Sequence, residues 1–92
     1  MEKRWYIYIL QCGDGTLYTG ITDDVTSRLE AHRAGKGAKY TRGRGPLTLV
    51  YQEEAENHSA AAKREWQIKQ LSRQQKEALC QTWHKNLGDE ES

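Results

Sequence analysis

Apolar residues are scarce in this sequence, and none of its apolar runs is long. Of 92 residues, 36% are hydrophobic and the mean hydropathy is −0.97, so a core must be thin and must draw on three Trp and five Tyr side chains. No run approaches the roughly 18 apolar residues of a membrane span, and no basic and apolar leader is recognised. We therefore expect one small, soluble, cytoplasmic domain that does not contact membranes.

Cysteine is equally scarce. Cys12 and Cys80 form neither a CxxC pair nor a disulfide framework. Two reduced thiols are expected.

The net charge of +1 hides an uneven distribution. Residues 28–44 hold six Lys and Arg residues against one acid, whereas residues 89–91 are all acidic. A basic stretch beside a glycine-rich loop is a common electrostatic signature of phosphate binding, but a solvated surface has the same composition. On charge alone, both interpretations stay open.

Residues 4–11 and 16–22 are rich in β-branched and aromatic side chains and are predicted to form two consecutive strands. Their apolar faces coincide only if odd residues pair with odd ones, which requires an odd-length loop with a glycine at positive φ. That register brings Tyr8 and Tyr18 together on one face, with open space beside them at Gly20. Phenol hydroxyls there can bind phosphate, position a water or take a proton.

Capping residues and glycines divide the rest of the chain into helices and one further strand. Gly35 ends the first helix, and Ser72 with Gln75 forms a capping-box pattern that begins the third. The order β-β-α-β-α-α predicts an α+β domain, a small three-stranded antiparallel sheet flanked by helices, over residues 1–83. Residues 84–92 are expected to form an acidic, disordered tail. The predicted bounds are a helix from Asp23 or Asp24 to Ala34, a loop over 35–45, a strand over 47–52, a helix from Asn57 or Ser59 to Leu71, and a helix from Ser72 to Trp83.

Two of these helices carry ionisable residues on faces that border the core. Arg28 and His32 are neighbours on the first helix. On the second helix, Glu65 shares one stripe with Ala61 and Ile68, where an unpaired carboxylate is costly. Glu65 is therefore expected to meet a cationic side chain, a metal ion or, in particular, an arginine.

The tyrosines stand in two triplets, Tyr6-Ile7-Tyr8 and Tyr18-Thr19-Gly20. Arg28 and His32 follow on the next helix, and Glu65 on a later one. Over nearly the whole chain this order resembles the GIY-YIG nuclease domain. The group it looks most like is the small single-domain bacterial one, which is related to the nuclease domain of the eukaryotic structure-specific endonuclease catalytic subunit.

This resemblance implies a metal-dependent, structure-specific endonuclease that hydrolyses phosphodiester bonds of DNA. Because no recognition helix with base-edge side chains is identified, we expect weak or no sequence specificity, or a protein partner that supplies targeting. Glu65 would bind a single Mg²⁺ or Mn²⁺ ion, and Arg28 would clamp the scissile phosphate. Tyr8 or Tyr18 would activate or orient the attacking water, and His32 is a further candidate as a proton or phosphate ligand. The residues expected to contact DNA are Tyr6, Lys36, Lys39, Tyr40, Thr41, Arg42 and Arg44.

Two departures from the family pattern keep other interpretations open. Tyr6 stands in place of Gly and Thr19 in place of Ile, and the late Asn of some members is not identified. The alternatives are an inactive nucleic-acid-binding module of the same fold and a protein-interaction domain. In either case Glu65 could be a structural ion-pair partner of Arg28, and the basic loop a solvated surface.

Overall fold

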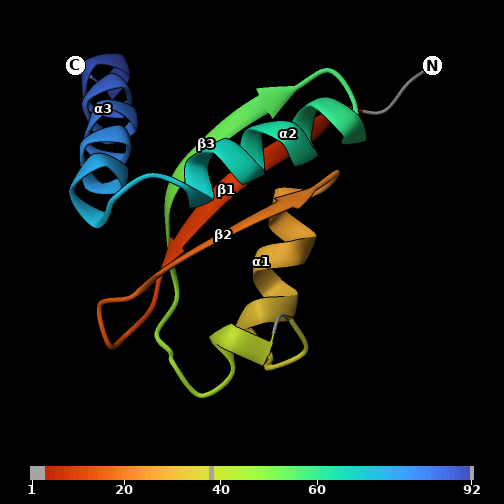
Figure 1. Cartoon of the computed structure of the whole chain (residues 1–92). Coiled ribbons are helices and arrows are strands. Elements are labelled where there is room, and N and C mark those ends of the chain that lie inside the picture. Colours follow the sequence, from red (N-terminus) through yellow and green to blue (C-terminus); the bar gives the residue numbers. More distant parts are fainter. Residues whose placement is uncertain (1–3, 38, 92) are drawn as a thin grey trace.

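A three-stranded antiparallel sheet with helices on both faces forms the protein (Figure 1). The structure is a computed structural model that describes residues 4–37 and 39–91, with side chains as far as Trp83. Its strand order is β2-β1-β3, so β1 is central. This arrangement confirms the predicted α+β fold. The elements are β1 (Trp5–Gln11), β2 (Leu17–Thr22), α1 (Val25–Arg33), the 3₁₀ turn η1 (Lys39–Thr41), β3 (Thr48–Ala55), α2 (His58–Lys69) and α3 (Arg73–Glu91).

The β1–β2 hairpin has the register that the sequence predicts. Odd residues pair with odd ones, as in Ile7 with Ile21. The connecting loop has an odd number of residues and turns at Gly15, whose φ of 87° favours a residue without a side chain. The apolar side chains of both strands consequently face α2, while Tyr8 and Tyr18 share the opposite face with α1.

The core lies between the sheet and the helices α2 and α3. At its centre Ile7, Ile9, Ala61 and Ile68 have no exposed surface. The expectation that all three Trp residues enter this core is wrong, because Trp66 is 65% exposed. Both cysteines are buried free thiols, as expected. No helix in the described part of the chain is long and apolar enough to cross a membrane.

Side-chain caps begin the helices where the sequence predicts. Asp24 caps α1, and Asn57 caps α2 by accepting a hydrogen bond from a backbone N–H three residues later. Ser72 and Gln75 bond reciprocally to each other's backbone N–H and begin α3. Gly35, at a φ of 78°, follows the end of α1.

The ends of two elements differ from the prediction. β3 runs to Ala55 rather than Gln52, because the polar residues after Gln52 pair along β1 and their carboxylates find cations. The backbone of α3 continues to Glu91, so its predicted end at Trp83 is wrong. Side chains beyond Trp83 lie outside the described set, and the division of the chain into domain and tail stays a prediction.

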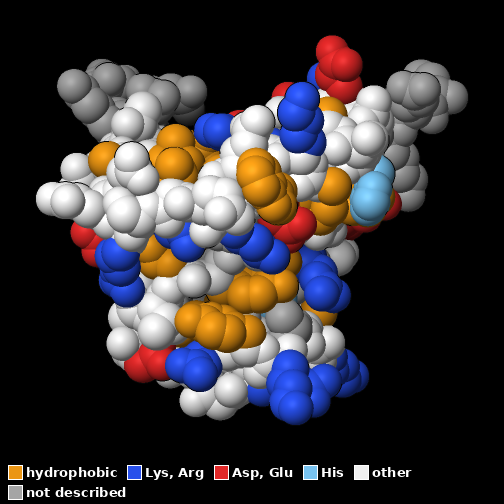
Figure 2. Space-filling model, viewed as in Figure 1, with side chains coloured by type: hydrophobic (Ala, Val, Ile, Leu, Met, Phe, Trp, Pro, Cys, Tyr) orange, Lys and Arg blue, Asp and Glu red, His pale blue; other side chains and the backbone are white. Residues whose placement is uncertain are grey.

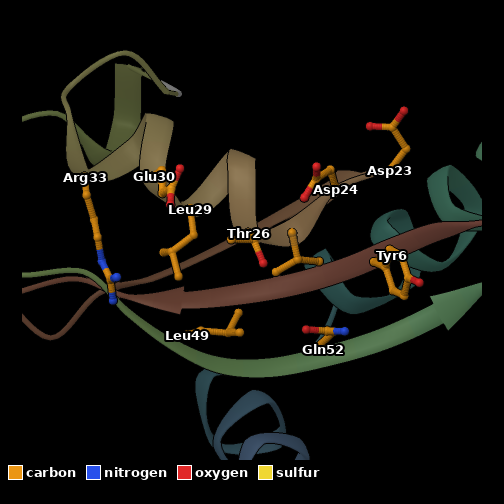
Figure 3. Close-up of a pocket in the computed structure, with 10 residues that line it drawn as sticks. Tyr6, Asp23, Asp24, Thr26, Leu29, Glu30, Arg33, Leu49 and Gln52 are labelled. Atoms are coloured by element: carbon orange, nitrogen blue, oxygen red, sulfur yellow. The ribbon is translucent and has the colours of Figure 1, made fainter.

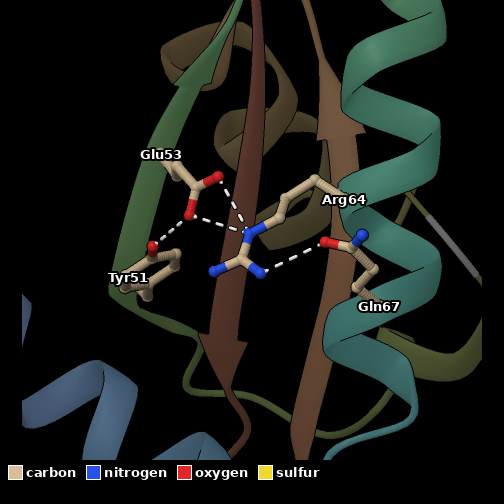
Figure 4. A network of polar contacts seen from close by, with 4 residues as sticks. All are labelled: Tyr51, Glu53, Arg64 and Gln67. Carbon is tan, nitrogen blue, oxygen red and sulfur yellow. Dashed lines mark hydrogen bonds and ion pairs between the residues drawn. The ribbon is translucent and has the colours of Figure 1, made fainter.

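A polar network fixes α2 to β3 across the central strand (Figure 4). Glu53 accepts hydrogen bonds from the Tyr51 hydroxyl and from Arg64 Nε, the latter at 3.0 Å, and Arg64 also donates to Gln67 at 3.4 Å. Burial first, and then the bond to Glu53, raises the pKa of Tyr51 to about 12, so its hydroxyl remains a donor. Because Glu65 follows Arg64 directly, this network also sets the position of Glu65.

Replacing Glu53 with Ala tests the network. The change removes the acceptor that Tyr51 and Arg64 share, so the free energy of unfolding should fall by about 1–3 kcal/mol. Glu54 is the matched control, because it lies on the other face and makes an exposed ion pair with Arg4 at 2.8 Å. Glu54→Ala should cost less than about 1 kcal/mol. Chemical denaturation of both variants checks this, and equal losses would contradict it.

Candidate active site

Tyr8, His32 and Thr41 form a buried chain of hydrogen bonds on the α1 face of the sheet. The Tyr8 hydroxyl lies 2.8 Å from His32 Nε2, and His32 Nδ1 lies 2.9 Å from Thr41 Oγ1. Each of the three side chains is about 2% exposed. Because each hydroxyl can donate or accept, either neutral tautomer of His32 satisfies both bonds; in the one with its proton on Nδ1, His32 donates to Thr41 and accepts from Tyr8. The chain of bonds thereby joins β1, α1 and η1.

Gly20 and Gly37 leave room for the hydrogen-bonded side chains of Tyr8 and His32. A Cβ on Gly20 would lie 2.6 Å from the Tyr8 hydroxyl oxygen and 3.1 Å from Tyr18 Cε2, and one on Gly37 would collide with the His32 ring. The Tyr8 and Tyr18 ring centroids are 6.3 Å apart. Open space at Gly20 was predicted from the sequence, but the Tyr8 hydroxyl fills it.

Tyr18 and Tyr40 extend the cluster towards the surface. The Tyr18 ring meets His32 edge-on at 5.4 Å and stacks on Tyr40 at 5.8 Å, with 28° between the two tyrosine planes. The Arg44 guanidinium lies 4.7 Å from the Tyr40 ring centre and pairs with Asp14 at 2.6 Å. Tyr40 is 44% exposed, so part of its surface remains open to a ligand.

Arg28 on α1 and Glu65 on α2 both act electrostatically on Tyr8. Burial raises the pKa of Tyr8 above its ordinary 10.0; Arg28 lowers it by a smaller amount, and Tyr18 and Glu65 add to the rise. In the protein without ligands, burial outweighs Arg28.

His32 is held as a neutral imidazole. Burial lowers its pKa below 6.5, and the positive charge of Arg28 lowers it further. A neutral ring whose Nε2 carries no hydrogen can accept a hydrogen bond from the Tyr8 hydroxyl, which an imidazolium could not do.

Glu65 does meet a cation, as the sequence predicts, and that cation is Lys69. The Glu65 carboxylate lies 3.4 Å from Lys69 Nζ one turn later, and its side chain is 24% exposed. Ala61 and Ile68, on the same stripe, are fully buried. Sequence reasoning missed Lys69, although the i,i+4 spacing was the signal that could have found it.

The carboxylate of Glu65 suits a metal ion that takes few ligands from the protein. Among the residues that the structure describes, no three His, Cys, Asp or Glu side chains come together as a metal site. A half-buried carboxylate within electrostatic range of Tyr8 fits a hydrated Mg²⁺ or Mn²⁺ ion, which keeps several waters and takes one or two carboxylates. Such an ion would compete with Lys69 for Glu65.

The basic loop lies at one end of the molecule. Lys36, Lys39 and Arg42 are exposed there, and Figure 2 shows Lys and Arg side chains gathered at the end that carries η1 and the adjoining loop. The charge of Arg44 is partly offset by its ion pair with Asp14. Three exposed cations and the edge of Tyr40 are therefore the part of the predicted DNA surface that is accessible.

Two residues expected to contact DNA are not on this exposed surface. Thr41 lies in η1, but its side chain is buried and bonded to His32. Tyr6 lines a cavity of about 430 Å³ between α1 and the sheet (Figure 3), where carboxylates outnumber cations and disfavour phosphate. The charged residues that line this cavity are Asp23, Asp24, Glu30 and Arg33.

Comparison with known proteins identifies the class to which this arrangement belongs. The family model of the GIY-YIG catalytic domain matches residues 4–78. A UPF0213 protein of Streptococcus sanguinis is 57% identical over 76 residues, 83% of this chain and 87% of that one. A UPF0213 protein of Halobacterium salinarum is 57% identical over 74 residues, 80% of this chain and 96% of that one.

Two solved structures agree with this assignment. The solution NMR structure of a UPF0213 protein of Bacillus halodurans has a TM-score of 0.56 at 48% identity, covering 86% of this chain and 84% of that one. A second NMR structure, of an E. faecalis protein, has a TM-score of 0.61 at 42% identity, covering 91% and 92%. The chain belongs to the GIY-YIG family, and its relatives include small UPF0213 proteins. The resemblance seen in the sequence is confirmed.

Gly20→Ala tests how tightly the Tyr8 hydroxyl is enclosed. The added Cβ overlaps a phenol that is buried and has little room to move, so the free energy of unfolding should fall by about 1–3 kcal/mol. Gly45→Ala is the control, because a Cβ there meets nothing within 4 Å. Denaturation of both variants decides it. If the free energy of unfolding of Gly20→Ala equalled that of the wild type, the Tyr8 hydroxyl would not be tightly enclosed.

The lowered pKa of His32 predicts a pH dependence of stability. Below pH 6.5, its unfolded value, the unfolded chain binds more protons than the folded one. The free energy of unfolding should therefore fall as the pH drops from about 6.5 towards the folded pKa. His32→Gln should lose this part of the dependence, whereas the exposed His58→Gln should keep it. Denaturation between about pH 5 and 8 measures the effect, and the same slope in His32→Gln would refute it.

Proposed function

We propose that this protein is a metal-dependent endonuclease that hydrolyses phosphodiester bonds of DNA at the cluster around Tyr8. Membership of the GIY-YIG family supports a nuclease and makes DNA the expected substrate. The observation that carries the proposal is a buried phenol, Tyr8, that is hydrogen-bonded to His32 and lies within electrostatic range of Arg28 on α1 and Glu65 on α2. Titratable groups that are perturbed in this way gather at functional sites.

The proposed roles follow from charge and position. Arg28 binds the scissile phosphate and stabilises the negative charge that develops on its oxygens. Glu65 holds the Mg²⁺ or Mn²⁺ ion, which would supply Lewis-acid stabilisation of the attacked phosphate and the leaving oxygen. In this role Glu65 exchanges the ammonium group of Lys69 for the divalent ion.

Tyr8 is the better candidate of the two tyrosines for handling the water proton. Its raised pKa makes a free phenolate rare at neutral pH. The neutral His32 ring, however, accepts a hydrogen bond from the Tyr8 hydroxyl at 2.8 Å in the tautomer given above. Tyr8 orients the attacking water and passes a proton to His32 as the phenol takes one from the water. Tyr18, stacked on Tyr40, instead holds the Tyr8 ring and borders the substrate.

In this proposal the protein recognises the phosphates of DNA rather than its bases. The exposed cations of the basic loop suit backbone phosphates, which carry no sequence information. We propose cytoplasmic action on DNA with weak or no sequence specificity, directed to its target by a protein partner.

Glu65→Gln is the decisive variant. Purified protein is incubated with flap, bubble, single-stranded and duplex DNA, in Mg²⁺, Mn²⁺ or EDTA. The wild type should nick in the presence of metal, and Glu65→Gln should not, while its DNA affinity is unchanged or higher because a negative charge near phosphate is gone. Glu77→Gln, which also breaks an i,i+4 ion pair, should remain active. DNA binding without metal-dependent nicking by the wild type would instead indicate an inactive binding module.

Thermal melts of the same proteins test whether Glu65 is a metal ligand or a structural partner. Its pair with Lys69 is partly exposed, so Glu65→Gln should change the stability of the metal-free protein by less than about 1 kcal/mol. Mg²⁺ should raise the melting temperature of the wild type but not that of Glu65→Gln. A loss of about 3–5 kcal/mol without any metal effect would instead make Glu65 a structural partner of Arg28.

A further inference from the structure

A cavity of about 260 Å³ opens beside the cluster, at the edge strand β2. It borders the active site at two points, since Tyr18 belongs to both and Lys69 is the ion-pair partner of Glu65. The residues that line it are Leu17, Tyr18, Thr19, Tyr40, Lys69 and Lys76.

The charge in this cavity has one sign. Lys69 comes from α2 and Lys76 from α3, and none of the six lining residues is acidic. Lys69 is paired with Glu65 when no metal is present, and a divalent ion that took Glu65 would leave both ammonium groups to attract an anion. Phosphate is the anion that a nuclease substrate brings to this place.

The opposite wall suits the uncharged part of a nucleotide. Tyr18 and Tyr40 stack there, and 44% of Tyr40 is exposed. Thr19, on the other face of β2 from Tyr18, also lines the cavity: it is 4% exposed, and among the described side chains its Oγ1 is the one buried polar atom without a hydrogen-bond partner. A buried hydroxyl without a partner is unfavourable, so a change in the Thr19 rotamer that let it reach a ligand oxygen would be favoured.

We propose that this cavity binds the nucleotide next to the scissile phosphate when that nucleotide belongs to an unpaired DNA strand. Lys69 and Lys76 hold its phosphate, and the wall of Tyr18 and Tyr40 contacts its base. An unpaired strand is favoured over a duplex because a base must leave its stack before a tyrosine ring can reach its face. This inference rests on the proposed function and narrows its substrate to flaps, bubbles and single strands.

Lys76→Ala is the sharpest test, since Lys69 also affects Glu65. Binding to labelled oligothymidine and to duplex DNA is measured by fluorescence anisotropy in EDTA, so that cleavage plays no part. Affinity for the single strand should fall about tenfold, and the slope of log affinity against log salt should flatten by about 0.7 for one lost phosphate contact. Lys63→Ala removes the same charge from an exposed position on α2 outside the cavity, and should leave both quantities unchanged.

Tyr40→Leu separates the base contact from the phosphate contact. It should weaken binding to intact oligothymidine by about fivefold or more, but not binding to an abasic strand of the same length. Single-strand affinity unchanged in Lys76→Ala, or equal losses for single strand and duplex, would overturn the inference.

The endonuclease proposal can fail separately. If the wild type nicks DNA while Lys76→Ala binds single strands normally, the cavity assignment is wrong and the enzyme assignment stands. If nothing is nicked while both Lys76 and Tyr40 control single-strand binding, the cavity assignment stands and the enzyme assignment is wrong.

Discussion

The bond between Tyr8 and His32 is the interaction on which the geometry of the site depends. It helps to attach α1 and η1 to the face of the sheet opposite the apolar cluster around Ile7 and Ile9. Buried polar groups of this kind are stable only when each has a partner, so Tyr8, His32 and Thr41 fix one another. Neither neighbouring glycine position tolerates a side chain without displacing this chain of bonds.

The same burial determines the protonation states before any ligand arrives. It raises the pKa of Tyr8 and lowers that of His32, so both groups are neutral in the free protein. A hydrogen-bonded pair of neutral groups is well placed to share a proton when the electrostatic field changes. Arg28 already lowers both pKa values, and a further positive charge at Glu65 would act in the same direction on Tyr8. A cation bound at Glu65 would therefore favour the loss of the Tyr8 proton.

Much of this could be predicted from local sequence. Side-chain alternation fixed which face Tyr8 and Tyr18 share, and Asp24, Asn57 and Ser72 marked where helices begin, because strand register and capping depend on near neighbours. The hydrogen-bond partner of Thr41 and the ion-pair partner of Glu65 were harder to predict from the sequence. Thr41 is bonded to a ring nine positions away that only the course of the loop brings close. The Lys69 pair was hidden by the assumption that a carboxylate on a buried stripe needs an arginine or a metal.

Glu65 shows how so small a core can hold a partly exposed carboxylate in place. Ala61 and Ile68 anchor the inner stripe of α2 with no exposed surface, and Arg64 fixes the helix rotation by reaching Glu53 on the far strand. These contacts set the rotation of α2 about its axis and its distance from the sheet. The position of Glu65 therefore does not depend on a bound cation. The helix that completes the core therefore also presents the carboxylate, and the position of the site follows from the position of the core.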